Sequence, residues 1–258
     1  MTMLKIDVAE TFQHLEHAPI VEAVIEIRTH VESPWEESAL REHLKAKLPG
    51  YPKIHSQSEF RHEMKMKPGQ PPEQILHDSG WKGLRLQSAD DRYIAQFNRD
   101  GFVFSRLEPY ESWDQFKEEA MRLWNVYADL AKSLEVQRLG VRFINRITLP
   151  AREVRLDAYL VVPPQPPGEL DLQILRFFHQ DNLLVTGYPY VINIVKTVQP
   201  PQGAGSDGGG LILDIDVFTT EPFERRADTI DKRLAEMRWL KNKVFYNSLT
   251  REAVERLK

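Results

Sequence analysis

The chain has 258 residues, of which 41% are hydrophobic, so it can bury a sizeable core and a disordered chain is excluded. Its 34 basic and 38 acidic residues give a formal net charge of −4, which is too balanced to indicate a polyanionic partner. The absence of cysteine excludes a disulfide scaffold, a thiol nucleophile and a cysteine zinc site.

Neither a membrane span nor a signal peptide is expected. No run approaches the roughly 18 apolar residues of a membrane helix, and the segment MTMLKIDVAETF has no apolar core of a signal peptide. Together with the absence of cysteine, these features favour a cytoplasmic protein with no membrane association. No cofactor is expected either.

The first predicted elements are a strand over 19–28 and a helix that follows it. In the strand, Val21, Ala23, Ile25 and Ile27 alternate with Glu22, Glu26 and Arg28, which is the period-2 pattern of a half-buried strand. For the helix, Ser33 is the expected cap, with Pro34 at the first helical position and Glu36 completing a capping box. The helix should end before Pro49.

Four short strands and a long helix are expected next. The strands are predicted over 60–67, 84–88, 93–98 and 102–107, with turn residues between them. The helix is predicted over 113–134, with Ser112 as its cap and an apolar stripe that faces the core. The stripe consists of Phe116, Ala120, Leu123, Tyr127, Leu130 and Leu134.

The second half repeats this plan. We expect a strand over 136–149, a strand over 171–179, a turn at 180–182 and a strand over 183–196. A loop over 199–210 contains GAGSDGGG, which lacks the lysine and the following helix of a phosphate-binding loop, so we interpret it as a flexible connection. A strand over 211–218, a helix over 222–243 and a short helix over 250–257 capped by Thr250 complete the chain.

These elements predict an α+β fold with a curved antiparallel sheet and two long helices packed on one face. Each half opens with a strand, continues through antiparallel strands and closes with a long helix, which suggests a duplicated unit. The halves would be 1–134 and 135–258, either as two units or as one continuous domain.

Three segments resemble an uncharacterised prokaryotic protein family of similar length that is distributed sporadically among bacteria and archaea. They are A-P-I-V-E-A-V-I-E-I-R at 18–28, R-L-G-V-R-F-I-N-R-I-T-L-P at 138–150 and F-Y-N-S-L-T-R-E-A-V-E-R-L at 245–257. The family has no established function to carry over. Its sporadic distribution is typical of genes that move horizontally, including defence and toxin–antitoxin genes.

The strongest polar pattern is an arginine stripe, formed by Arg138, Arg142 and Arg146. On a continuous strand all three share one face, while Leu139, Val141, Phe143 and Ile147 share the other. Guanidinium groups match phosphate and carboxylate bidentately, so one interpretation is an anion-binding or nucleic-acid-binding surface. The plainer interpretation is an exposed face whose arginines pair with carboxylates such as Glu22 and Glu26.

A second polar pattern is the D-x-D of Asp214 and Asp216 on the strand over 211–218. Two carboxylates on one face could contribute to a divalent-metal site. No third ligand is evident, so a solvated polar face is favoured and no metal site is expected.

Three functions remain open from the sequence. The first is a non-enzymatic binding or interaction protein in a defence or toxin–antitoxin type context. The second is a nucleic-acid-binding module that uses the arginine stripe. The third is an enzyme or small-ligand protein, with a pocket between the sheet and the long helices that bears Asp214 and Asp216. The partner is accordingly an unknown protein or a nucleic acid, and a homodimer is one further assembly that the sequence allows.

Overall fold

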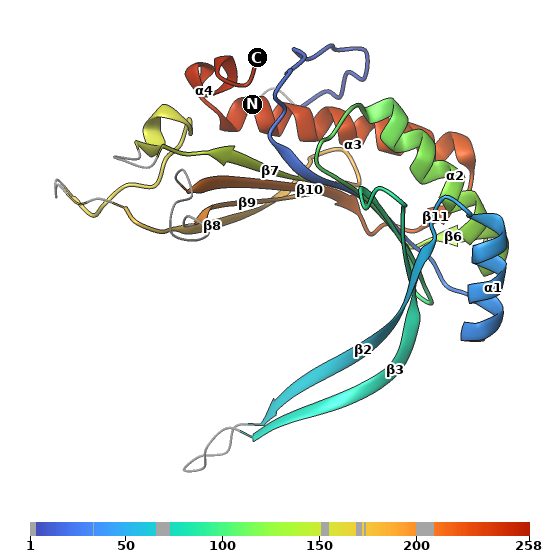
Figure 1. The fold of residues 1–258 in the computed structure, drawn as a ribbon. Helices are drawn as coiled ribbons and strands as arrows, with labels where there is room; N and C mark the ends of the chain where they lie inside the picture. Colours follow the sequence, from blue (N-terminus) through green and yellow to red (C-terminus); the bar gives the residue numbers. More distant parts are fainter. Residues whose placement is uncertain are drawn as a thin grey trace.

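A large antiparallel sheet organises the molecule (Figure 1). The computed structural model describes residues 4–32, 34–65, 73–150, 155–168, 172, 174–199 and 209–258, with side chains outside 60–79. Within these residues the sheet has nine strands in the order β2-β3-β4-β5-β1-β7-β10-β9-β8. The strands are β1 Ile20–Arg28, β2 Lys53–Lys65, β3 Glu73–Gln87, β4 Tyr93–Asn98, β5 Gly101–Leu107, β7 Arg138–Thr148, β8 Phe178–Leu184, β9 Val191–Gln199 and β10 Gly210–Thr219.

Helices cover one face of this sheet. In Figure 1, α2 and α3 lie along the convex side and α1 lies beside the base of β2 and β3. The helices are α1 Glu37–Lys47, α2 Trp113–Ala131, α3 Ala227–Ser248 and α4 Arg251–Glu255, with a 3₁₀ turn at Leu156–Ala158 and a small ladder of β6 Glu135–Val136 with β11 Phe223–Glu224. The prediction of an α+β fold with a curved sheet and two long helices on one face is confirmed.

The core lies between the sheet and these helices. The apolar alternation of β1 predicts its buried face correctly, since Ala23, Ile25 and Ile27 are fully buried. Asn145 also faces the core, and its side-chain amide donates to the backbone carbonyl of Leu213 at 2.9 Å. A buried amide needs such a partner, because an unsatisfied one would cost free energy.

The two halves of the sheet have the same strand order about its centre. In each half the first strand, β1 or β7, lies in the middle of the sheet, and the last strand, β5 or β10, pairs with it. The remaining strands follow outward, and β1 and β7 join the halves by antiparallel pairing. This order agrees with the duplicated plan, but α1 and β2 have no counterpart among the described residues of the second half, so the duplication stays a prediction.

The end of α2 and the start of α1 differ from the prediction. α2 ends at Ala131 because Lys132 adopts a left-handed conformation, so Leu134 lies outside the helix and is 72% exposed. α1 begins at Glu37 and Glu36 makes no capping bond, so the predicted capping box is wrong. Ser33 lies outside the described residues. The caps at Ser112 and Thr250 are confirmed, since their hydroxyls accept from the backbone N–H groups of Gln115 and Ala253.

Two strand predictions and the predicted start of α3 are also corrected. β8 runs through the predicted turn at 180–182, and the chain turns at 185–190 before β9. β2 and β3 form one long hairpin where shorter strands over 60–67 and 84–88 are expected. Phe223 belongs to β11, so α3 begins later than predicted, at Ala227. Most of the glycine-rich connection, residues 200–208, lies outside the described residues.

The curvature of the sheet leaves a concave face opposite the helices. The β2–β3 hairpin projects away from the rest of the sheet, and β7, β10, β9 and β8 form the other arm (Figure 1). Among the described residues no helix packs on this concave side. Each helix that the structure describes is too short or too polar to cross a lipid bilayer.

Candidate functional site

The arginine stripe lies on the concave face of the sheet. β7 pairs with β10 without a shift in register from Leu139 to Thr148, and with β1 without a shift from Arg138 to Ile144, so Gly140 introduces no bulge and the three arginines share one face. The opposite face of β7 carries the buried Leu139, Val141 and Phe143 against the helices. The predicted orientation of the stripe therefore holds. Its assignment as a binding site stays a prediction.

Arg138 is more enclosed than Arg142. Its side chain is 15% exposed and pairs with the carboxylates of Glu26 on β1 and Asp216 on β10. The guanidinium also stacks on Phe218, with 4.4 Å between its central carbon and the ring centroid. Gly140 provides the space for this arrangement, because a Cβ there would lie 2.7 Å from a guanidinium nitrogen. Groups on β1, β7 and β10 therefore surround this side chain and fix its position on the sheet.

Arg142 and Asp214 form a bidentate pair across β7 and β10. The Nε–Oδ1 distance is 2.9 Å and the Nη2–Oδ2 distance is 2.5 Å, a geometry in which both carboxylate oxygens accept from one guanidinium. Asp214 is 8% exposed, whereas the Arg142 side chain remains 48% exposed. Arg142 therefore neutralises a buried carboxylate and still reaches the surface.

Asp216 is the carboxyl of this face whose pKa is shifted by its surroundings. Burial raises the pKa of its carboxyl above the ordinary value, and the nearby charges of Arg138 and Arg142 oppose that rise. The ionised form is thus held in the fold mainly by the two guanidinium groups. A substitution that removes either guanidinium group therefore increases the free-energy cost of keeping the Asp216 carboxylate ionised.

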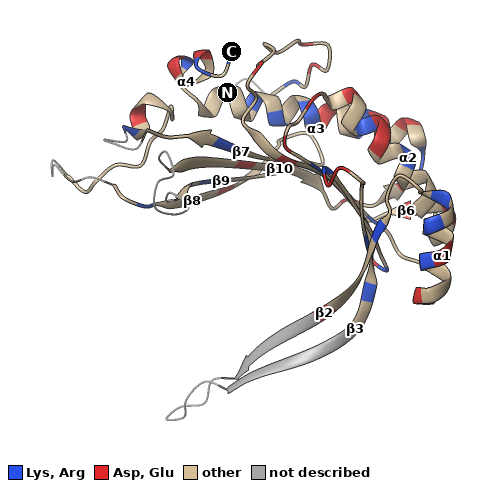
Figure 2. Ribbon diagram, viewed as in Figure 1, with Lys and Arg blue, Asp and Glu red and all other residues tan. Residues whose placement is uncertain are grey.

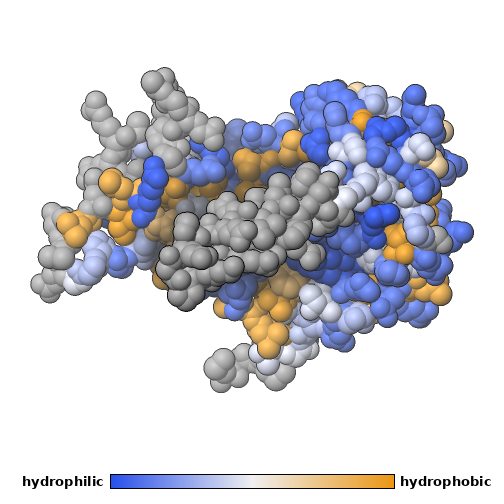
Figure 3. Space-filling view, turned by 90° about the horizontal axis from the view of Figure 1, so that it is seen from below, coloured by the Kyte–Doolittle hydropathy of each residue, from blue (hydrophilic) through white to orange (hydrophobic). Residues whose placement is uncertain are grey.

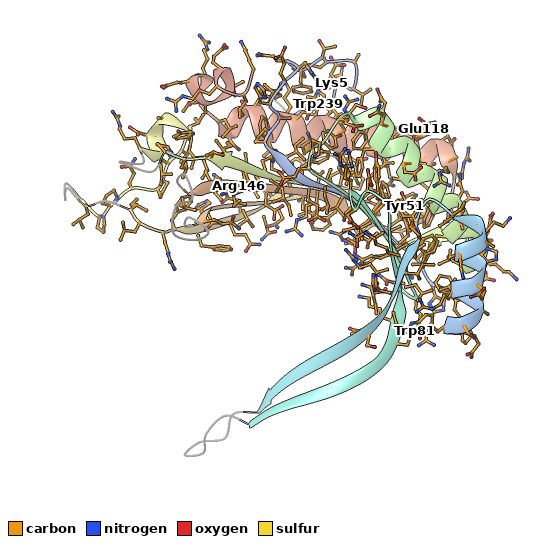
Figure 4. All side chains as sticks on the ribbon, in the orientation of Figure 1. Lys5, Tyr51, Trp81, Glu118, Arg146 and Trp239 are labelled. Carbon is orange, nitrogen blue, oxygen red and sulfur yellow. The ribbon has the colours of Figure 1, made fainter. Side chains whose placement is uncertain are left out.

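Arg146 differs from the other two arginines because it contacts no carboxylate in the described part of the chain. It lies on the sheet in the arm formed by β7–β10 (Figure 4), where it is partly exposed. Gly210 on β10 leaves room for it, since a Cβ there would lie 2.7 Å from the Arg146 Nε. Glu22, one of the two predicted partners, likewise shows no ion pair among the described residues.

Together these side chains make a charge-balanced surface, which we call the charged face. It comprises Glu22, Glu26, Arg28, Arg138, Arg142, Arg146, Asp214 and Asp216. Four cationic and four anionic groups alternate across β1, β7 and β10, and charges of both signs are interspersed over the rest of the molecule as well (Figure 2). The face therefore offers directional ion pairs, and the formal charges of its eight residues sum to zero.

Sequence reasoning missed the main partners of the stripe. Glu26 was expected and does pair with Arg138, but Asp214 and Asp216 supply the other pairs and were considered as metal ligands. The signal that identifies them is cross-strand register, because Asp216 lies opposite Arg142 and Asp214 is diagonal to it. That register depends on which strands become neighbours.

Adding a divalent metal is expected to leave the melting temperature unchanged. The reason is that Arg142 occupies both oxygens of Asp214, while Asp216 faces Arg138. The measurement is a thermal melt in EDTA and then with Mn²⁺, Mg²⁺ or Zn²⁺. A metal at ~100 times its dissociation constant would add about 2.7 kcal/mol, so a rise of several degrees would contradict this expectation and restore the two aspartates as ligands.

The third functional alternative needs a pocket between the sheet and the long helices that bears Asp214 and Asp216. The structure places both carboxylates on the other face of the sheet, away from α2 and α3. A shallow cavity of about 400 Å³ lies elsewhere, beside α4, where Tyr159 and Arg256 contribute to its lining. The two aspartates and this cavity therefore do not form one site.

Lys241, an ionisable residue on the helix side of the sheet, was not predicted from the sequence to have an unusual environment. The Lys241 ammonium on α3 lies 4.0 Å from the centroid of the Phe143 ring, and burial lowers its pKa to about 7. An aromatic face stabilises a cation there in place of a carboxylate. No charged partner of Lys241 is seen in the described region, and its position in α3 gave no pattern from which this environment could be predicted.

Comparison with known proteins adds no relative: no protein-family model matches the chain, and no curated protein matches it. The resemblance noted above accordingly rests on its three sequence segments alone.

Proposed function

We propose that this protein is a non-enzymatic binding protein that holds another macromolecule against its charged face. The observation that carries the proposal is the one-sided covering of the sheet. All long helices pack on the convex side, whereas the concave side carries organised charged groups with no helix over them in the described residues. A sheet face that serves only to build a core would not need bidentate ion pairs on its solvent side.

Charge balance supports a protein partner over a nucleic acid. Most of the arginine charge is already met by carboxylates of the same chain, namely Glu26, Asp214 and Asp216. Nucleic acids are bound mainly through phosphate contacts with unpaired cations, and such interfaces carry strong positive charge. A protein surface that presents both signs of charge is the better complement to alternating cations and anions.

Arg146 is the residue on which this proposal is best tested. Because no carboxylate of the described chain pairs with it, Arg146→Glu is expected to leave the melting temperature nearly unchanged and to weaken capture of the native partner from cell extract. Arg251→Glu is the matched control, since Arg251 is an exposed arginine with no ion pair among the described residues, and its helix α4 lies on the helix side of the sheet (Figure 1). Equal capture by both variants would remove the charged face from consideration.

The same variants distinguish a nucleic acid from a protein. If the captured partner were duplex DNA, binding would fall steeply with salt, and losing one phosphate contact at Arg146 would reduce the slope of log K against log salt by about 0.9. A protein partner bound by balanced ion pairs should show a shallow slope. A steep slope that Arg146→Glu reduces would replace our proposal with the nucleic-acid alternative.

A further inference from the structure

The strand β8 lies at one end of the sheet, and its outer edge is uncovered by any residue that the structure describes. β8 pairs with β9 on one side, and no described residue pairs with its other side. The opposite edge of the sheet is treated differently, since α1 packs against β2 and the Arg41 guanidinium donates to the backbone carbonyl of Ile54 at 2.8 Å. An uncovered edge strand presents free N–H and C=O groups to any other strand.

The direction of these free groups follows from the turn that precedes β9. Val185 donates to the carbonyl of Tyr190 at 3.0 Å, which makes these two residues a hydrogen-bonded pair in register with the ladder. Hydrogen-bonded and non-hydrogen-bonded pairs alternate in an antiparallel ladder. The backbone groups of Phe178, Gln180, Asn182 and Leu184 therefore point away from β9, toward the free edge.

Asp181, a charge on the helix side of the sheet, is the one feature of β8 that is typical of a protected edge. The strand has no proline, no lysine and no bulge. Phe178 is 69% exposed and Leu184 is 75% exposed. Further exposed apolar side chains precede the strand at Leu172 and Leu175, and Figure 3 shows hydrophobic residues gathered at this end of the molecule. An exposed apolar edge of this kind is expected to be covered by a binding partner when the protein functions.

The pattern along β8 is symmetric about its middle residue. Reading from either end of F-H-Q-D-N-L-L, the residues with outward backbone groups are apolar, amide, amide and apolar, and Asp181 lies at the centre. A strand of this kind complements a second copy of itself in antiparallel orientation, as a two-fold interface requires. From this symmetry we propose that β8 pairs with β8 of a second copy of the chain and forms a homodimer with one continuous sheet.

The register of the proposed dimer is fixed by the two-fold axis at Asp181. Phe178 then lies opposite Leu184 of the partner subunit, and Gln180 lies opposite Asn182 of the partner subunit. The outward backbone groups of both strands satisfy one another, and aromatic and aliphatic side chains meet at both ends of the ladder. The dimer would place two concave faces side by side, and it does not depend on what the charged face binds.

This register predicts how a substitution of Asp181 changes the stability of the dimer. The two Asp181 side chains would lie opposite each other on the helix side of the sheet, where like charges are unfavourable. His179, at 2.9 Å, and Lys196, at 3.9 Å, flank the carboxylate and offset part of that repulsion. Asp181→Asn is accordingly expected to strengthen the dimer, measured as a lower dissociation constant in sedimentation equilibrium.

The mass of the protein in solution is the first test. The wild type is expected at twice the mass of one chain in sedimentation equilibrium. Asn182→Pro should yield a monomer with a nearly unchanged melting temperature, because the N–H that it removes points away from β9. Asn182→Ala is the control, since it keeps that N–H and should remain a dimer. A monomeric wild type, or a dimer that is indifferent to proline, overturns the proposal.

Disulfide formation tests the register without relying on the proline variant. The chain has no native cysteine, so Asp181→Cys introduces the only thiol. Opposed residues in a non-hydrogen-bonded pair have Cα atoms about 4.5 Å apart, within the range of a disulfide. Two cysteines from Leu183→Cys would be offset by four residues, about 13 Å along the strand. Oxidation should cross-link the first variant and leave the second uncoupled; the reverse result, or no cross-link in either, contradicts the two-fold at Asp181.

Discussion

Leu123→Ala is expected to lower the free energy of unfolding by about 2–5 kcal/mol. Leu123 is fully buried on α2, the helix that packs on the centre of the N-terminal half of the sheet. Truncating it removes apolar contacts and leaves a cavity that the surrounding aromatic side chains cannot fill without moving. Equilibrium unfolding in urea, monitored by circular dichroism, measures the loss as a lower midpoint.

Leu134→Ala is the matched control for this experiment. Leu134 continues the same apolar spacing in the sequence, but it lies beyond the end of α2 and is 72% exposed. Its truncation should change the free energy of unfolding by less than ~0.5 kcal/mol. If Leu123→Ala left stability unchanged and abolished partner binding, the stripe on α2 would be an interface and its place in the core would be wrong.

The contrast between these two leucines shows how far local pattern determines a helix. The spacing of apolar residues predicts both the existence of α2 and its buried face, because those depend on neighbours three and four residues apart. The end of the helix depends on Lys132 adopting a positive φ of 57°. A lysine gives no sign of this in the sequence, since the left-handed position usually carries glycine or asparagine.

β8 was mispredicted for a different reason. A strand that is exposed on both faces shows no alternation of apolar and polar residues, so the period-2 signal that identifies β1 is missing. Gln180, Asp181 and Asn182 are moreover residues typical of turns. Here the pairing with β9 decides the structure, and a non-local ladder of seven residue pairs overrides the local preference.

For the charged face, too, one property could be predicted from local sequence and another could not. Alternation along β7 is enough to place Arg138, Arg142 and Arg146 on one side of the sheet. Their partners could not be predicted, since β10 follows β7 by some sixty residues and pairs with it only through the topology of the whole sheet. The orientation of the stripe is therefore local information, whereas the difference between the paired Arg142 and the unpaired Arg146 is not.

Arg138→Met is expected to destabilise the protein by about 2–3 kcal/mol, between the values typical of exposed and fully buried ion pairs. The arginine is 15% exposed and lies between Glu26 and Asp216, which are 21% and 19% exposed. Methionine keeps an apolar stem against Phe218 but leaves both carboxylates without their shared cation. Urea unfolding at neutral pH measures the effect, and Arg226→Met, which removes an exposed pair with Asp228, should leave the unfolding midpoint nearly unchanged.

Two further measurements assign this loss to the carboxylates. In Arg138→Met the pKa of Asp216, already raised by burial, rises further, and an acid with a raised pKa destabilises the fold only while it is ionised. The deficit relative to wild type should therefore shrink as the pH falls toward the ordinary aspartate value of 3.8. Adding Glu26→Gln and Asp216→Asn to Arg138→Met should recover most of the stability at neutral pH. A deficit that is independent of pH and persists in the triple variant would instead assign the role of Arg138 to its stacking on Phe218.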